Sequence, residues 1–80
     1  MKYKVCDRVK IKGLDWYNAN KNAEGNVMIK GGFRFTQNMT VLCGKEAVVE
    51  EVNEELQLYG ILYDGFRFYL DQDCIESVVD

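Results

Sequence analysis

The sequence predicts an all-β protein that is built from hairpins. The tetrapeptide Gly-Phe-Arg-Phe occurs twice, at Gly32–Phe35 and at Gly65–Phe68, and each copy follows a short apolar run. An apolar run, a glycine turn and a Phe-x-Phe strand are typical of a β-hairpin. Residues 3–12 alternate apolar and polar side chains, whereas no long stretch of the chain has helical periodicity. Strands of period two therefore account for most of the predicted structure.

Length and composition fit one small domain over residues 1–80. Apolar residues make up 48% of the chain, which is ordinary for a globular domain and too many for a disordered segment. No apolar run approaches the roughly 20 residues that span a membrane. The basic N-terminus also lacks the apolar stretch of a signal peptide. We therefore expect a cytoplasmic protein without a membrane segment.

The first predicted strand covers residues 3–12 and ends at Gly13. The apolar residues of one parity are Tyr3, Val5, Val9 and Ile11. The basic residues of the other parity are Lys2, Lys4, Arg8, Lys10 and Lys12. Alternation of this kind predicts a half-buried strand, here with a basic outer face.

The next segment, residues 13–26, is predicted to be a long first loop. It holds four asparagines and two glycines, which suit turns because they tolerate positive φ. Trp16 and Tyr17 are large for such a loop, so at least one should fold back over the core. Val27–Ile29 and Phe33–Phe35 then predict the first hairpin, and residues 36–39 predict one short helical turn.

The second half of the chain predicts the remaining strands. Residues 46–52 form a strand with a fault in its alternation, so either Val48 and Val52 face the core or a bulge at Glu50 and Glu51 shifts the register. Residues 56–63 are apolar on both faces, which predicts a central strand bent near Gly60. Asp64-Gly65 predicts a tight turn, and residues 66–70 and 74–78 predict the last two strands.

This order of elements predicts a small five-stranded SH3-like barrel with a long first loop and one short helical turn. The expected core is a single cluster of apolar side chains from all strands. Its members are Val5, Val9, Ile11, Phe33, Phe35, Met39, Leu42, Ala47, Val49, Leu58, Ile61, Phe66, Phe68 and Ile75.

The chain also resembles the small uncharacterised SH3-like barrel proteins of bacterial and phage genomes. The phrases that carry the resemblance are CDRVKIKGLDWYN, FTQNMTVLCGKEAVVEEV and YGILYDGFRFYLDQDCIE, which run over nearly the whole chain. Many such proteins have glycine where this chain has Cys6, so we expect the first turn to differ. The resemblance implies the fold and gives almost no information about function.

Catalytic and metal chemistry have little support in the sequence. The chain has no histidine, which is the commonest general base and the commonest zinc ligand. Its three cysteines, Cys6, Cys43 and Cys74, are far apart in sequence and form no Cys-x-x-Cys motif. The glycines do not have the spacing of a phosphate-binding loop. We therefore expect a non-catalytic protein with no metal site and no cofactor.

An aromatic groove is the first candidate binding site. It would combine Trp16 and Tyr17 of the long loop with an outward tyrosine, of which Tyr69 is one choice beside Tyr59 and Tyr63. SH3-like barrels bind extended peptides on aromatic ridges of this kind. The alternative is that these rings close the core of a very small barrel.

The basic face of the first strand is the second candidate, with Lys4, Arg8, Lys10 and Lys12 as phosphate contacts. Residues 1–45 carry nine basic and three acidic residues, a net charge of +6, whereas residues 46–80 carry one basic and ten acidic residues, a net charge of −9. The alternative is therefore that acids such as Glu76 pair with this strand. We expect a protein or peptide partner rather than nucleic acid, and a monomer or weak homodimer.

Overall fold

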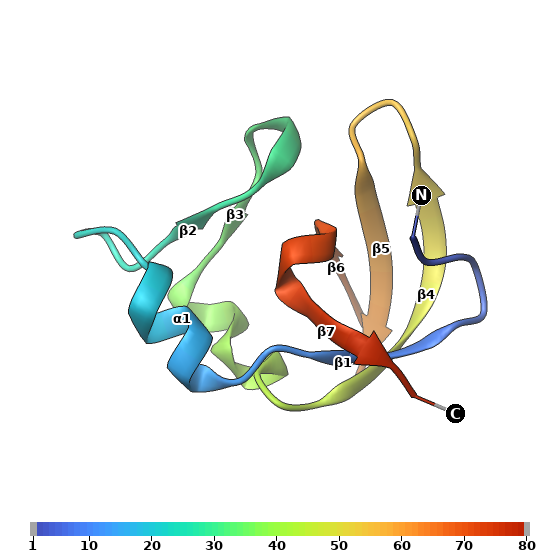
Figure 1. The fold of residues 1–80 in the computed structure, drawn as a ribbon, viewed down its shortest axis with the longest axis horizontal. Helices are drawn as coiled ribbons and strands as arrows, with labels where there is room; N and C mark the ends of the chain where they lie inside the picture. The colour runs from blue at the N-terminus through green and yellow to red at the C-terminus, as the bar shows by residue number, and fades with distance from the viewer. Residues whose placement is uncertain (1, 80) are drawn as a thin grey trace.

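A computed structural model of the chain describes residues 2–79, and its main element is a five-stranded antiparallel sheet in the order β6-β5-β4-β1-β7 (Figure 1). The strands of this sheet are β1 (Arg8–Ile11), β4 (Glu46–Asn53), β5 (Leu58–Tyr63), β6 (Phe66–Leu70) and β7 (Ile75–Val78). A separate hairpin consists of β2 (Val27–Met28) and β3 (Arg34–Phe35). The all-β prediction is thus confirmed.

Within residues 2–79, four short helices accompany the strands: α1 (Leu14–Asn20) and the 3-10 helices η1 (Lys30–Gly32), η2 (Gln37–Leu42) and η3 (Gln72–Cys74). In Figure 1, α1 and the β2–β3 hairpin stand on one side of the molecule and the large sheet on the other. Strands β6 and β7 are at the two ends of the sheet order and are not paired with each other within residues 2–79. The sheet therefore does not close into the predicted barrel.

The predicted long loop contains a helix, which is a correction to the sequence analysis. Residues Leu14–Asn20 form α1, whose first turn carries Asp15, a favourable charge at a helix N-terminus. Asparagine is a weak helix former, so the sequence favoured turns. Packing against β3 stabilises the helix instead: the Trp16 and Phe35 rings meet edge-on with centroids 5.2 Å apart. A short helix of this kind depends on such tertiary contacts.

The first strand is shorter than predicted. Cys6 has a φ of 77°, and the amide of Asp7 donates to the carbonyl of Lys4, so residues 4–7 form a turn. Val5 is consequently 51% exposed, which corrects its assignment to the core. Tyr3 remains buried because its amide donates to Tyr59 Oη at 3.0 Å and their rings meet edge-on.

The β-bulge predicted at Glu50 and Glu51 is confirmed. The register of β4 against β5 shifts between Val49 and Glu51. The bulge lets Val49 and Val52 both face inward, because one extra residue reverses the alternation. The neighbouring strand β5 is buried from Leu58 to Ile61, as expected for a central strand with two apolar faces.

Both predicted hairpins are present. Strand β2 pairs with β3, and β5 pairs with β6 over five consecutive residue pairs. Asp64 and Gly65 have φ values of 53° and 80°, the two positive values that a tight two-residue hairpin turn requires. The predicted helical turn after the first hairpin is also present as η2.

The hydrophobic core lies between the sheet and the segment that carries α1, the β2–β3 hairpin and η2. Most of the predicted core residues are buried or half-buried, but Phe33 is 39% exposed and Phe66 is 67% exposed. Both belong to the twin Gly-Phe-Arg-Phe segments, so in each copy the second ring packs against the core and the first is exposed to solvent. The buried residues that the sequence analysis left out of its core are Tyr3, Tyr17, Val27, Ile29, Tyr59, Leu70 and Cys74.

Candidate functional site

The three aromatic residues of the predicted groove fall into two separate clusters. Tyr17 is 4% exposed, and its ring packs against Phe35 with centroids 6.1 Å apart. Trp16 is half-buried on the same phenylalanine. Tyr69 packs instead against Phe33, with ring centroids 5.9 Å apart. Trp16 and Tyr17 thus hold α1 on β3, and only Tyr69 contributes to an exposed aromatic surface.

This exposed surface consists of Phe33, Leu56 and Tyr69, and we call it the tip surface. The three side chains come from the β2–β3 hairpin, the β4–β5 turn and β6, and they are 39%, 40% and 36% exposed. Gly31 lies between two of them: a Cβ atom added there would be 3.3 Å from Phe33 Cδ2 and 3.5 Å from Leu56 Cβ. The absence of a side chain at Gly31 therefore allows Phe33 and Leu56 to approach each other.

Two polar contacts hold the segments of the tip surface in place. Lys30 Nζ donates to Gln57 Oε1 at 2.8 Å and so joins the β2–β3 hairpin to the β4–β5 turn. The carboxylate of Asp71, which is 3% exposed, accepts the backbone amides of Lys30 and Asp73. Asp71 thereby caps η3 and fixes the tip of the hairpin with one side chain.

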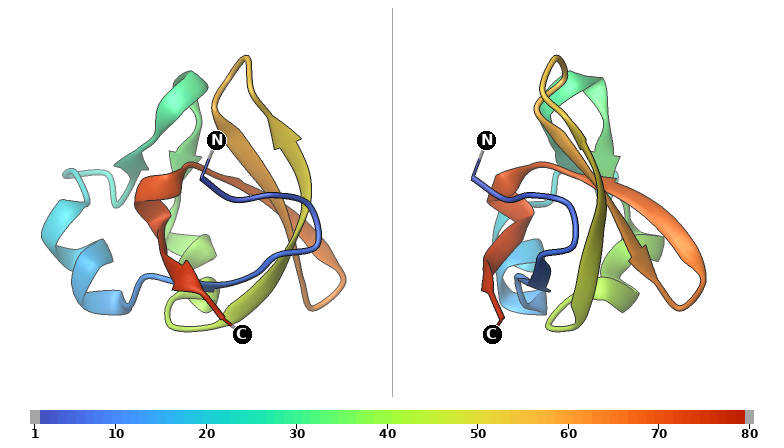
Figure 2. Two further views of the ribbon diagram at one scale, coloured as in Figure 1. Left: turned by 45° about the vertical axis from the view of Figure 1, so that its right-hand side comes forward. Right: turned by 90° about the vertical axis from the view of Figure 1, so that its right-hand side faces the viewer.

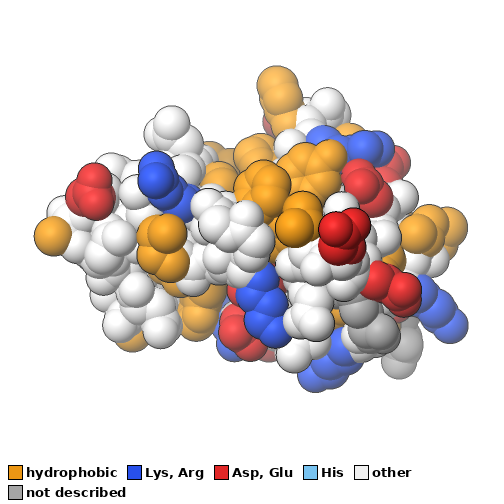
Figure 3. Space-filling model, turned by 90° about the horizontal axis from the view of Figure 1, so that it is seen from above, with side chains coloured by type: hydrophobic (Ala, Val, Ile, Leu, Met, Phe, Trp, Pro, Cys, Tyr) orange, Lys and Arg blue, Asp and Glu red, His pale blue; other side chains and the backbone are white. Residues whose placement is uncertain are grey.

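Carboxylates border the tip surface. Tyr69 Oη donates to Glu51 Oε1 at 3.3 Å, and Arg67 makes ion pairs with Glu50 at 3.1 Å and Glu51 at 3.5 Å. Glu54 and Glu55 precede Leu56 in the β4–β5 turn and are exposed. Seen from above, hydrophobic side chains gather near the middle of the face in Figure 3, with acidic side chains beside them. The basic neighbours Arg67 and Lys30 are engaged with Glu50 and Glu51 and with Gln57, respectively.

The predicted basic residues lie along β1 and its flanks. Lys4 is in the turn before the strand, Arg8 and Lys10 are on it, and Lys12 follows it. Lys10 Nζ is 3.7 Å from Glu76 Oε2 on β7, and Lys10 is also opposite Glu46 on β4. Both neighbouring strands therefore place carboxylates next to this stripe, in agreement with the alternative that the sequence analysis left open.

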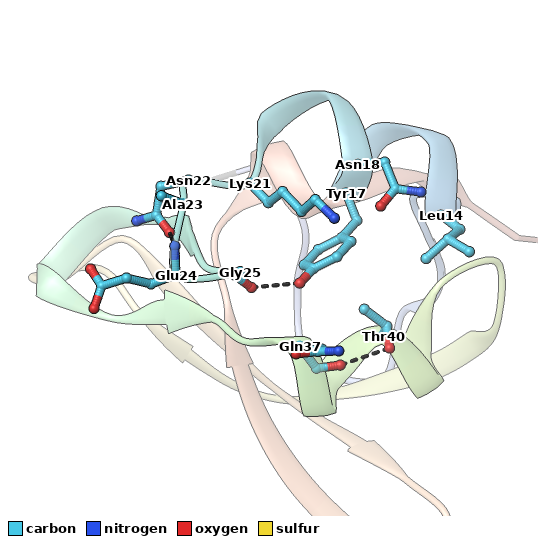
Figure 4. A pocket seen from close by; sticks show the side chains of 10 residues that line it. All are labelled: Leu14, Tyr17, Asn18, Lys21, Asn22, Ala23, Glu24, Gly25, Gln37 and Thr40. Atoms are coloured by element: carbon cyan, nitrogen blue, oxygen red, sulfur yellow. Dashed lines mark hydrogen bonds between the residues drawn. The ribbon is translucent and has the colours of Figure 1, made fainter.

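A polar hollow of about 420 Å³ lies beside α1 (Figure 4). Its lining residues are Leu14, Tyr17, Asn18, Lys21, Asn22, Ala23, Glu24, Gly25, Gln37 and Thr40. Lys21 Nζ lies over the Tyr17 ring, 5.5 Å from its centroid, and the Asn22 carboxamide accepts the amides of Glu24 and Asn26. Much of the polar lining is thus engaged in shaping the loop. Asn18 and Asn22 were expected to be turn residues, and no sequence pattern predicted a hollow beside them.

Two of the three cysteines, Cys43 and Cys74, lie in surroundings that disfavour the thiolate. Burial raises the pKa of the Cys74 thiol well above its ordinary value, and burial also raises the pKa of Cys43. A nucleophilic cysteine requires the opposite shift, because the thiolate is the reactive form. Within residues 2–79, no three His, Cys, Asp or Glu side chains are grouped so that they could hold a metal ion.

None of the helices in residues 2–79 has the length and apolar character that are needed to cross a membrane. Comparison of the sequence with models of known protein families finds no match, and neither curated proteins nor solved structures give a significant match.

Proposed function

We propose that this protein is a non-catalytic protein-interaction module that binds a peptide segment of another protein on the tip surface. The observation that carries the proposal is the packing of Phe33 against Tyr69 at a solvent-exposed position, with the exposed Leu56 nearby across Gly31. Single exposed apolar residues are normal on protein surfaces, whereas contiguous ones indicate interaction sites. Aromatic side chains are also enriched among the residues that contribute most binding energy.

The charges around the tip surface define the chemistry of the partner. Glu54 and Glu55 precede Leu56 and are exposed, whereas Arg67 and Glu51 pair with each other and the Lys30 ammonium donates to Gln57. Electrostatic complementarity therefore favours a segment that combines an aromatic or aliphatic anchor with Lys or Arg. The anchor would lie on Phe33 and Tyr69, and the basic side chain would face the carboxylates.

An SH3-like domain is part of the proposal. The strand order β6-β5-β4-β1-β7, with the first and last strands as neighbours and η3 between β6 and β7, supports it. The resemblance to small bacterial and phage proteins is consistent with an accessory role in the cytoplasm. SH3-like domains bind extended peptides in aromatic-lined grooves, and Phe33 and Tyr69 supply the aromatic rings here.

Nucleic-acid binding through Lys4, Arg8, Lys10 and Lys12 is the second candidate, and fewer observations support it. Lys10 already pairs with Glu76, and Glu46 lies opposite it on β4. Binding to phosphates depends on the release of counterions, which nearby carboxylates oppose. Titration with short duplex and single-stranded DNA at two salt concentrations tests this candidate, because an absence of binding at low salt would exclude it.

Selection of peptides from a random displayed library tests the main proposal. We expect enriched sequences that combine Trp, Phe or Leu with Lys or Arg. A synthetic peptide of that sequence should shift the NMR amide signals of Phe33, Leu56 and Tyr69. Phe33→Glu and Leu56→Glu should each weaken its binding by about tenfold or more, because each places a charge in an apolar contact.

Leu14→Glu is the matched control for these variants. Leu14 is 52% exposed on α1, so the substitution adds the same charge to an exposed apolar residue away from the tip surface. We expect this variant to bind the peptide like the unmodified protein. Enriched peptides that bind Phe33→Glu equally well, or a library without enriched peptides, would contradict the proposal.

A further inference from the structure

We propose that the polar hollow beside α1 binds a neutral, hydroxyl-rich small molecule, namely a sugar unit. This site goes beyond the peptide site, because none of its lining residues belongs to the tip surface. In the left view of Figure 2, α1 (light blue) lies low in the molecule, whereas the tips of the β2–β3 hairpin (green) and of the β4–β5 turn (gold) are at the top. The two sites therefore occupy different parts of the surface.

Two helical segments form facing walls of the hollow. Figure 4 shows Asn18 of α1 and Lys21, which directly follows it, on one side, and Gln37 and Thr40 of η2 on the other. Thr40 Oγ1 donates to the backbone carbonyl of Gln37 at 2.7 Å, which holds the hydroxyl against its own helix. The volume of about 420 Å³ is within the range of small-molecule sites.

Gly25 keeps the space between the walls open. Tyr17 Oη donates to the carbonyl of Gly25 and so joins the loop after α1 to the helix. A Cβ atom added at Gly25 would be 3.3 Å from that hydroxyl and 3.8 Å from Gln37 Oε1, so a side chain there would crowd both residues. The hollow is thus preformed, as small-molecule sites usually are.

Several polar side chains of the hollow have no role in holding the fold together. Within residues 2–79, the side chains of Asn18, Glu24 and Gln37 form no hydrogen bond and no ion pair. Lys21 makes one contact, with its ammonium over the Tyr17 ring. Their donors and acceptors therefore remain available to a ligand.

Asn18 is the clearest of these residues because the helix gains nothing from it. Asparagine is a weaker helix former than alanine, so it lowers the stability of an exposed helical position. Asn20 compensates, since its carboxamide donates to the carbonyl of Trp16 at 2.7 Å. Asn18 has no such bond within the described residues, and it lines the hollow. Ligand binding accounts for an asparagine that local structure does not explain.

The chemistry of the lining favours a neutral ligand with hydroxyl groups. Its charged residues are Lys21 and Glu24, whose charges cancel, so neither an anion nor a cation is favoured overall. The carboxamides of Asn18 and Gln37 both donate and accept hydrogen bonds, as hydroxyl groups do. The Tyr17 ring is 4% exposed beneath the Lys21 ammonium, so hydrogen bonds rather than ring stacking would hold the sugar.

NMR titration of the full chain with a panel of sugars tests the site. Glucose, galactose, N-acetylglucosamine, sucrose and maltotriose are each added up to about 100 mM, a range that detects a millimolar Kd. We expect at least one of them to shift the side-chain amide signals of Asn18 and Gln37 and the backbone amide of Gly25. The signals of Phe33 and Tyr69 should not move. Tighter binding of maltotriose than of glucose would identify a unit of a longer carbohydrate rather than a free sugar.

Two variants separate ligand binding from stability. Asn18→Ala should weaken sugar binding by about three- to tenfold, because it removes hydrogen bonds to the ligand. The same variant should raise the midpoint of urea unfolding, because alanine is the better helix former. Gln37→Leu should also weaken binding by about three- to tenfold. Gln72→Leu is its matched control, since Gln72 is an exposed glutamine of η3 outside the hollow, and it should bind sugar like the unmodified protein.

Four results would overturn the inference. The first is an absence of shifts with every sugar, and the second is binding of inorganic phosphate or N-methylacetamide at these residues as tightly as any sugar. The third is equal weakening by Gln37→Leu and Gln72→Leu. The fourth is a lower urea midpoint for Asn18→Ala, which would give Asn18 a structural role. Phe33→Glu should leave sugar binding unchanged, so the two proposed sites are tested separately.

Discussion

Asp71 is the buried polar residue on which the tip of the molecule depends. Its carboxylate accepts the amides of Lys30 at 3.2 Å and Asp73 at 3.0 Å, and the Cys74 thiol lies 3.5 Å from it. A buried carboxylate is stable only when such donors surround it. The sequence indicated a turn at this position, but the contact with Lys30, 41 residues earlier, is a long-range one. Local patterns contain no information about such a contact.

Replacement of Asp71 should destabilise the fold. Asp71→Ala leaves the amides of Lys30 and Asp73 without their acceptor, so we expect the free energy of unfolding to fall by about 2–4 kcal/mol. Asp71→Asn, which keeps one acceptor oxygen, should cost less. Urea denaturation measures both. Asp73→Ala is the control, because Asp73 is exposed and contributes its backbone rather than its side chain; a similar loss in this variant would contradict the assignment.

The three cysteines should differ in reactivity. Cys6 is exposed, Cys43 is partly buried with a raised pKa, and Cys74 is buried with a strongly raised pKa. Because only the thiolate reacts, each unit of upward pKa shift lowers the alkylation rate about tenfold. A brief pulse of iodoacetamide at pH 8, followed by peptide mass spectrometry, should therefore modify Cys6 first and Cys74 last. In urea the three rates should converge; rapid labelling of Cys74 in the folded protein would contradict its burial.

At the scale of elements, α1 and the first strand show where sequence patterns fail. The apolar patterns predicted β4, β5 and β6 well: alternation marked β6 and the first part of β4, and apolar residues on both faces marked the central strand β5. The helix was missed because asparagine favours turns and because its stability comes from Phe35 on a distant strand. The first strand was predicted too long because the apolar alternation continues through the turn at Cys6. The positive φ of Cys6 reveals this turn, whereas the alternation does not.

Phe35 should be the residue that joins the helix to the sheet. It is fully buried and contacts the rings of Trp16 and Tyr17. Phe35→Ala would leave a cavity, so we expect a loss of about 3–5 kcal/mol in the free energy of unfolding. Trp16 is the only tryptophan, so its fluorescence reports the change directly: emission should shift to longer wavelength. Phe33→Ala, at the exposed ring of the same segment, should cost much less; equal losses would contradict the two roles.

At the scale of the whole molecule, the two oppositely charged halves of the sequence meet in one sheet. Strand β1 from the basic half lies between β4 and β7 of the acidic half. The charge asymmetry suggested this contact as the alternative to a free basic face, since oppositely charged strands are favourable neighbours. The candidate site was predicted only at Tyr69, because the tip surface brings together residues 33, 56 and 69 through folding. Phe33 was assigned to the core because a Phe-x-Phe pattern within one strand places both rings on one face. The pattern does not show that β3 begins only at Arg34, after Phe33.

Added salt should lower the stability of the domain only slightly. Three ion pairs are formed by the side chains of residues 2–79, and all of them are largely exposed to solvent. Exposed pairs contribute little and are screened by salt. Raising sodium chloride from low to near-molar concentration should therefore reduce the free energy of unfolding by less than about 1 kcal/mol. Chemical denaturation at both concentrations measures this, and a loss of several kcal/mol would show that the charge asymmetry matters more than the geometry indicates.

The pairing of β1 with β7 also governs when this chain can fold. Lys10 lies opposite Ser77, so β1 pairs with a strand that is synthesised much later than itself. Until β7 has left the ribosome, β1 lacks one side of its ladder, and Val9 and Ile11 lack part of their cover. Contacts between such distant residues also slow folding because a long loop must close first. We therefore expect the sheet to form only after β7 has been synthesised, in one step that joins β7 to β1.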